Sequence, residues 1–353
     1  MNPTETDRVS DPLFQLNVVL WLTQPLPQGS SIVPLLHERG FVVYAISPPL
    51  PVPLDLQAAA QSARVALQNS GRPDVLLAHP LERKFAFIEC KASSFGPNSN
   101  TAEQARSFLL MAGPRAAEVL GLDPAHVRGS LLAYLVPAGQ TSALRTTLEQ
   151  LQRDLNDFQM PAGNFSVVGL EMAALEVRLI VDGQGSAFLS LASGSHVIIR
   201  FQPETDPRPL YFIPYDPDVT YPSETERLFC KRILFERIHS SVLVAAGRSN
   251  TPADILLSVN DLLNDAMFGM YALWENRDSA QHMRGLCKQL LQAITRAVNG
   301  EVPQAISYDP ERGWKVALIT DEHRQKVIDA LTRFSCETMN LKAPPEEDLF
   351  DRP

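Results

Sequence analysis

Two short apolar runs, separated by a turn-like segment, constrain the fold of this chain more than any other feature. The first run covers residues 75–77 and the second covers residues 85–88. An acid borders each run, Asp74 before the first and Glu89 after the second. The spacing suits two strands joined by a turn at residues 79–83. We therefore predict a β-hairpin that brings Asp74 and Glu89 close together.

A lysine completes this group of charged residues. Side chains alternate between the two faces of a strand, so Glu89 and Lys91 should point the same way and Cys90 the opposite way. Lysine is scarce here, with seven lysines against twenty-four arginines. Only Lys84 and Lys91 follow an acid by two residues, and Lys84 borders the predicted turn. Lys91 is therefore the lysine that fits an acid–lysine pair at a strand end.

Two carboxylates and an ammonium group at neighbouring strand ends suit chemistry on a phosphodiester. Mg²⁺ prefers oxygen ligands at about 2.1 Å and commonly takes only one or two carboxylates from a protein. Asp74 and Glu89 could supply these carboxylates, and the backbone carbonyl of Cys90 is a further candidate ligand. A bound Mg²⁺ or Mn²⁺ would activate a water and stabilise charge on the phosphate. Lys91 would orient that water or neutralise the developing charge.

The proline before Asp74, together with Glu89-Cys90-Lys91, resembles the motif of the PD-(D/E)XK, or restriction-endonuclease-like, nuclease superfamily. The resemblance covers about residues 30 to 180. It implies a mixed sheet flanked by helices, which agrees with the α/β order of apolar segments along this part of the chain.

The helix expected after the second run contains Gln104 and Phe108. This pattern is similar to the Gln-xxx-Tyr of the subgroup that contains recombination-repair nucleases, with Phe in place of Tyr. The resemblance implies that Gln104 joins the catalytic residues. A second explanation stays open, because Thr101-x-x-Gln104 also fits a helix capping box.

The alternative for Glu89 and Lys91 is a structural salt bridge, because short patterns of common residue types recur by chance. Four weaker site candidates lie nearby in the sequence: Glu38, His79, Ser93 and Ser94.

Composition is that of an ordinary globular protein, with 45% hydrophobic and 20% charged residues. The sequence contains no run of eighteen apolar residues, so no membrane span is predicted. The polar, acidic first residues are unlike a signal peptide. We therefore expect a cytoplasmic location. The four cysteines lie far apart with no CxxC pair, which indicates neither a zinc site nor a disulfide framework. The sequence contains no GxxxxGK[ST] loop, so we do not expect an ATPase motor.

Net charge bears on the partners. The formal charge of −9 argues against a free-standing DNA binder, because phosphate contacts come from Lys and Arg. Residues 72–115 nevertheless contain six basic and four acidic residues. We expect DNA as the substrate, a protein partner or a homo-oligomer as the assembly, and no membrane association.

The domain organisation follows from changes in sequence character. We expect a nuclease-like domain, a β ribbon with a proline-rich connector, a helical domain and a disordered acidic tail, over residues 1–180, 181–222, 223–340 and 341–353. In the first domain, residues 14–22 are apolar enough for a strand or a buried helix, and periodicity does not choose between them.

The leading functional hypothesis is a Mg²⁺- or Mn²⁺-dependent nuclease that hydrolyses DNA, in a bacterial anti-phage defence or repair complex. This biological setting is suggested by the kinds of bacterial chains in which such a core occurs, and it does not follow from the site itself. An alternative is a catalytically silent subunit with the nuclease fold that acts as a binding or scaffolding component. A restriction or modification-sensing specificity subunit is a third possibility.

Overall fold

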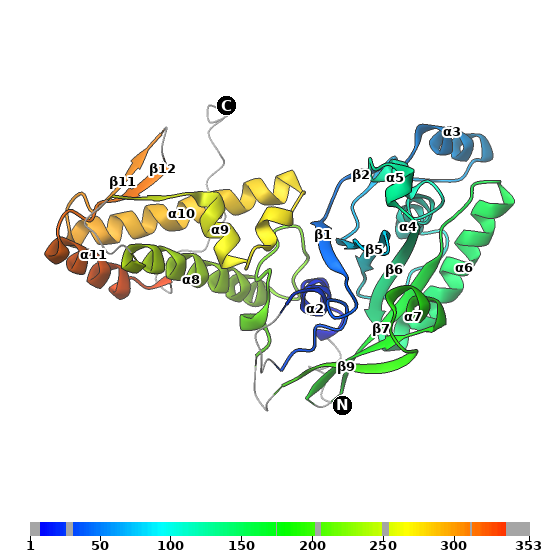
Figure 1. Cartoon of the computed structure of the whole chain (residues 1–353), viewed down its shortest axis with the longest axis horizontal. Helices are drawn as coiled ribbons and strands as arrows, with labels where there is room; N and C mark the ends of the chain where they lie inside the picture. The colour runs from blue at the N-terminus through cyan, green and yellow to red at the C-terminus, as the bar shows by residue number, and fades with distance from the viewer. Residues whose placement is uncertain are drawn as a thin grey trace. The chain divides into compact units, whose positions relative to one another are not determined.

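The structure is a computed structural model that describes residues 8–25, 31–173, 175–201, 206–248, 254–310 and 313–336. The chain forms two compact units, labelled by element in Figure 1. The N-terminal unit spans residues 1–207 with 273–276, and the C-terminal unit spans residues 208–272 with 277–353. No helix in the described ranges is long and apolar enough to cross a membrane.

A seven-stranded mixed sheet forms the centre of the N-terminal unit, in the order β1-β4-β5-β6-β7-β8-β9. Its strands are β1 (Val42–Ile46), β4 (Val75–His79), β5 (Lys84–Cys90), β6 (Gly129–Pro137), β7 (Phe165–Ala173), β8 (Glu176–Val181) and β9 (Gly194–Arg200). Strands β5, β6 and β7 are parallel neighbours, and the pairs on either side of them are antiparallel. Parallel neighbours need a crossover connection, which the helices supply.

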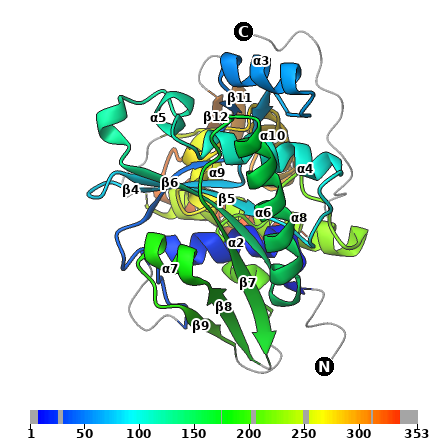
Figure 2. The same ribbon diagram turned by 90° about the vertical axis from the view of Figure 1, so that its right-hand side faces the viewer.

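Helices α4 (Asn100–Met111) and α6 (Thr141–Asp157) cover one face of this sheet. Their apolar residues share a core with alternate strand residues such as Phe87, Tyr134 and Val167. Figure 2 shows α6 running beside β7. In α6 the buried leucines recur at helical spacing, so one stripe of the helix faces the sheet.

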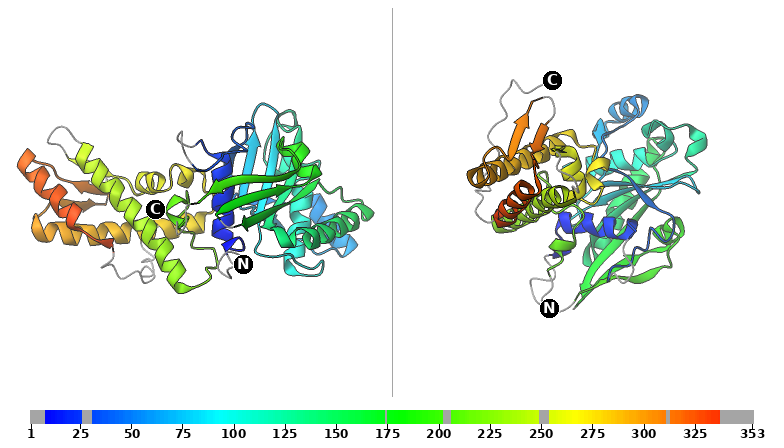
Figure 3. Two further views of the ribbon diagram at one scale, coloured as in Figure 1. Left: turned by 90° about the horizontal axis from the view of Figure 1, so that it is seen from below. Right: turned by 60° about the vertical axis from the view of Figure 1, so that its left-hand side comes forward.

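Helix α2 (Pro12–Thr23) lies against the opposite face, where it contacts β1 and β5 (Figure 3). All residues from Leu13 to Thr23 are buried. A segment that is apolar all round shows no helical periodicity, and such a helix is stable only when it is buried on every side. The sequence allowed either a strand or a buried helix for residues 14–22, and the structure shows a helix.

The remaining elements of this unit are short. They are α3 (Leu54–Ala63), α5 (Ala116–Val119), α7 (Gly183–Leu189), the paired strands β2 (Leu50–Pro51) and β3 (Ser70–Gly71), and the 3-10 turns η1 (Pro124–His126) and η2 (Ala138–Gln140).

The C-terminal unit is mostly helical. Its helices are η3 (Arg208–Leu210), α8 (Glu224–Arg248), α9 (Val259–Ala266), α10 (Arg277–Glu301) and α11 (Asp321–Arg333). A small sheet contains β10 (Ile255–Leu257), β12 (Gly313–Val316) and β11 (Ile306–Asp309), in that order. The turn η4 (Met270–Leu273) includes residues of both units. The expected α/β class, with a mixed sheet flanked by helices and a helical C-terminal region, is confirmed.

One local expectation differs from the structure. The ribbon expected from residue 181 is instead helix α7 followed by β9, which extends the main sheet to Arg200. Asp182 caps α7 by accepting a hydrogen bond from the Gly185 amide, so the helix starts directly after this residue. The tail at residues 341–353 lies outside the described residues.

Candidate functional site

The predicted hairpin is present as strands β4 and β5. They pair antiparallel with Val75 opposite Ile88, so one further step in the register sets Asp74 opposite Glu89. Directly opposed residues of an antiparallel pair share a face, with Cβ atoms about 5 Å apart. The face is the one covered by α4 and α6, because Leu76 and Phe87 belong to that core. The two acids therefore lie side by side on one face of the sheet.

Asp74 is anchored by the backbone of the neighbouring strand. Its Oδ2 accepts a hydrogen bond of 2.6 Å from the amide of Cys90. Its own carbonyl accepts from the amide of Ser47, at the end of the β1–β4 ladder. This second bond ties the Asp74 backbone to β1. The carboxylate is thus fixed at the strand ends.

Glu89, Lys91 and Gln104 form a chain of polar contacts. The Nζ atom of Lys91 lies 2.7 Å from Oε1 of Glu89 and donates a 3.2 Å hydrogen bond to Oε1 of Gln104. Gln104 reaches the site from α4. The N-cap of α4 is Ser99, which accepts from the Ala102 amide. The capping box considered for Gln104 is therefore not the arrangement observed, and its side chain faces Lys91.

Sequence reasoning missed Gln15, which reaches the site from α2. Its Nε2 donates to the carbonyl of Lys91 at 2.9 Å and to the carbonyl of Val9 at 2.7 Å. Gln15 is completely buried, and its Oε1 has no hydrogen-bond partner among the described residues. The signal in the sequence is a polar residue inside an apolar segment. That signal becomes informative only when the segment is known to be a buried helix.

Burial perturbs the carboxylates. Desolvation, reinforced by the Asp74 charge and opposed by Lys91, raises the pKa of Glu89 to about 8. Burial also raises the pKa of Asp74, against the opposing hydrogen bond from Cys90 and the charge of Lys91. Ionisation of both neighbouring buried carboxylates is unfavourable, so the pair retains a proton near neutral pH.

Lys91 behaves differently from a lone buried lysine. Burial by itself acts to lower the pKa of Lys91, but the Glu89 and Asp74 carboxylates outweigh it and raise this pKa above its ordinary value. Lys91 is therefore charged throughout the physiological pH range. Its side chain is 24% exposed, against 3% for Glu89, so solvent reaches the site from the lysine side.

Two buried polar atoms near the acids are without partners in the described part of the chain. One is Oε2 of Glu89, and the other is the hydroxyl of Tyr134, whose residue is paired with Glu89 in the β5–β6 register. Burial, together with the Glu89 and Asp74 charges, raises the pKa of Tyr134 well above its ordinary value, which keeps the hydroxyl neutral. Buried polar atoms usually have partners. An unpartnered carboxylate oxygen beside a second carboxylate has the chemistry of a cation ligand.

The other candidates are placed away from this group. His79 is buried at the end of β4, where its ring packs edge-on against Phe41 and its Nδ1 accepts from the Glu82 amide. Ser94 donates to Oε1 of Gln140 at 2.7 Å. For Glu38 and Ser93, no described contact joins either residue to the acids. The Cys90 thiol is buried and forms no disulfide, and the Cys90 amide donates a hydrogen bond to Asp74.

No family model, curated protein or solved structure matches this chain. The chemistry of the site is therefore inferred from its own geometry.

Proposed function

We propose that Asp74, Glu89 and Lys91 form the active site of a metal-dependent nuclease that hydrolyses phosphodiester bonds of DNA. The observation that supports this most directly is the buried, unpartnered Oε2 of Glu89 beside the Asp74 carboxylate, with the Lys91 ammonium 2.7 Å from the other Glu89 oxygen. Acid, acid and ammonium at one pair of strand ends is also the arrangement expected from a restriction-endonuclease-like core.

The donor set fits a hard divalent cation. Asp74 and Glu89 would hold Mg²⁺ or Mn²⁺, with the Cys90 carbonyl as a further candidate. The described residues contain no group of three or more His, Cys, Asp or Glu that could hold a metal. Two carboxylates still suffice, because Mg²⁺ usually keeps several waters and takes other ligands from substrate phosphates. When bound, the cation would supply Lewis acidity that activates water and offsets charge on the phosphate.

The protein groups around the acids would position the reacting atoms. Lys91 presents an ammonium group to the developing negative charge, and Gln104 fixes its direction through the 3.2 Å hydrogen bond. Gln15 holds the backbone of Lys91 from the other side of the sheet. These contacts keep the ammonium beside Glu89 before any substrate arrives.

The proposed substrate is DNA, and the proposed setting is a bacterial defence or repair complex with a protein partner or a second copy of the chain. Both rest on the resemblance to nucleases and on the basic balance of residues 72–115.

A cleavage assay tests the proposal. The purified chain with Mg²⁺ or Mn²⁺ should cut plasmid or linear DNA, and EDTA should stop cutting. Asp74→Asn, Glu89→Gln and Lys91→Met should each reduce cutting at least a hundredfold while the chain stays folded by circular dichroism. Glu82→Gln is the matched control, because Glu82 forms an exposed ion pair with Lys84 in the turn of the same hairpin. Cutting that persists in all three site variants would refute the assignment.

The alternative function, a catalytically silent scaffold with this fold, is favoured by the small number of acids at the site. Calorimetric titration with Mn²⁺ separates the two functions. An active site should bind Mn²⁺ with heat that disappears in Asp74→Asn. A scaffold should give the same heat with both proteins and should keep its assembly when either acid is replaced.

A further inference from the structure

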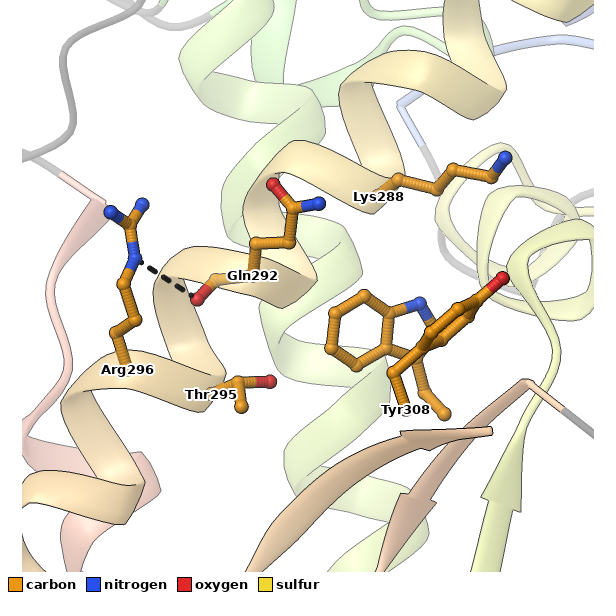
Figure 4. Close-up of a pocket in the computed structure, with 6 residues that line it drawn as sticks. Lys288, Gln292, Thr295, Arg296 and Tyr308 are labelled. Atoms are coloured by element: carbon orange, nitrogen blue, oxygen red, sulfur yellow. Dashed lines mark hydrogen bonds between the residues drawn. The ribbon is translucent and has the colours of Figure 1, made fainter. Parts of the chain in front are cut away.

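The C-terminal unit has a pocket of about 570 Å³ lined by helix α10 and the hairpin of β11 and β12 (Figure 4). The lining residues are Lys288, Gln292, Thr295 and Arg296 from the helix and Tyr308 and Trp314 from the hairpin. The helix residues recur at i, i+4, i+7 and i+8, so they share one face of α10. Leucines such as Leu286 and Leu290 on the other face are buried in the core.

Two cations give this pocket a positive charge. Neither Lys288 nor Arg296 forms an ion pair within the part of the chain that the structure describes; the Nε atom of Arg296 donates only a long 3.4 Å bond to the Gln292 carbonyl, drawn as a dashed line in Figure 4. Residues 279–300 of α10 contain three Arg or Lys and no Asp or Glu, in a chain of net charge −9. A local basic face on an acidic protein indicates an anionic ligand.

The hairpin adds an aromatic platform. Tyr308 and Trp314 are paired in the register, and their ring centroids are 5.1 Å apart. Trp314 is 5% exposed, whereas Tyr308 is 54% exposed. The tyrosine ring is thus held by a buried indole and open to solvent. A nucleic-acid base can stack on an exposed ring of this kind.

The indole also lacks a hydrogen-bond acceptor. The Nε1 atom of Trp314 is buried and has no partner among the described residues. An indole nitrogen can only donate, and buried donors are normally paired. A base or sugar oxygen in the pocket could supply the acceptor.

The spacing of the cations favours a strand over a mononucleotide. Arg296 follows Lys288 by eight positions, a rise of about 12 Å along α10. The two side chains point away from each other in Figure 4, so successive phosphates of one strand suit them better than a single phosphate does. A duplex keeps its bases stacked on each other, so the tyrosine ring selects unpaired bases.

We propose that this pocket binds a short segment of single-stranded nucleic acid, with a base stacked on Tyr308 and phosphates at Lys288 and Arg296. The proposal is independent of cleavage by the N-terminal unit.

Fluorescence anisotropy tests it with the full chain in EDTA, which prevents cutting, and a labelled oligothymidylate of about fifteen nucleotides. Tyr308→Ala should weaken binding by about tenfold or more, and Tyr308→Phe should retain it because the ring is kept. The double variant Lys288→Gln with Arg296→Gln should reduce the slope of log affinity against log salt by about 1.4. Lys326→Gln is the control, because it removes a cation that is paired with Glu322 elsewhere in the same unit.

Three results would overturn the proposal. The first is equal affinity of the wild-type protein and Tyr308→Ala. The second is a double variant whose salt slope matches that of Lys326→Gln. The third is duplex DNA or an acidic peptide competing as well as the oligothymidylate. Glu89→Gln should bind the oligomer normally, so loss of cleavage and loss of this pocket are distinguishable.

Discussion

In the absence of metal, the N-terminal unit of Glu89→Gln should become more stable relative to that of the wild type as the pH rises. Glutamine has nearly the shape of a protonated glutamate but cannot ionise. The folded protein holds the pKa of Glu89 at about 8, above its ordinary 4.5. A carboxyl whose folded pKa is raised contributes stability that is complete below the unfolded pKa and is lost as the pH rises through the folded pKa. The wild type should therefore lose stability from roughly pH 5 upward, and the variant should lose less.

The size of the effect follows from this shift. At about 1.4 kcal/mol per pKa unit, the wild-type protein should lose up to about 3 kcal/mol between roughly pH 5 and pH 7.5 through this group. Loss of the contact between Glu89 and Lys91 lowers the stability of the variant by a similar amount at every pH. The quantity to follow is therefore the difference between the two proteins, which should change in favour of the variant by about 1 to 3 kcal/mol across that interval.

Native-state hydrogen exchange measured by mass spectrometry suits this test, because it reports the opening free energy of β5 and β6 separately from the C-terminal unit. Both proteins are compared at the same pH in EDTA, so that intrinsic exchange rates cancel. Glu82→Gln is the control: Lys84 lowers the pKa of the exposed Glu82, which is ionised at both pH values. A stability difference between wild type and Glu89→Gln that is equal at both pH values would refute the retained proton.

Three further predictions concern the N-terminal unit. Mn²⁺ at a hundred times its Kd should stabilise the wild type by about 2.7 kcal/mol, seen as a higher calorimetric Tm, and should leave Asp74→Asn unchanged; equal shifts would place the cation elsewhere. Gln15→Leu should slow DNA cleavage by about tenfold without changing KM, because the Lys91 carbonyl loses its donor; an unchanged kcat would contradict this. Gly163→Ala should lower the free energy of unfolding in urea by about 2 kcal/mol or more, because the new methyl group meets the Ala112 carbonyl. The control Gly139→Ala should change this free energy little, because its methyl group meets nothing within 4 Å. Similar losses in both variants would contradict the clash.

The sequence by itself determined the β4–β5 hairpin and the residues that it brings together. Two apolar runs, an acid beside each run and a turn-like segment between them are local features. Short-range geometry is enough to set Asp74 opposite Glu89 and to put Glu89 and Lys91 on one face. The order of apolar segments likewise determined the α/β class and the helical C-terminal half.

Tertiary structure alone decided the state of α2 and the polar contacts around the site. An apolar segment has no period that separates a buried helix from a buried strand, so only packing against β1 and β5 shows that α2 is a helix. The bond from Gln15 to Lys91 spans 76 residues of sequence. The unpartnered oxygen of Glu89 is buried on the sheet face whose core includes residues of β6 and α4. Burial depends on segments distant in the chain, and no local pattern of residues encodes it.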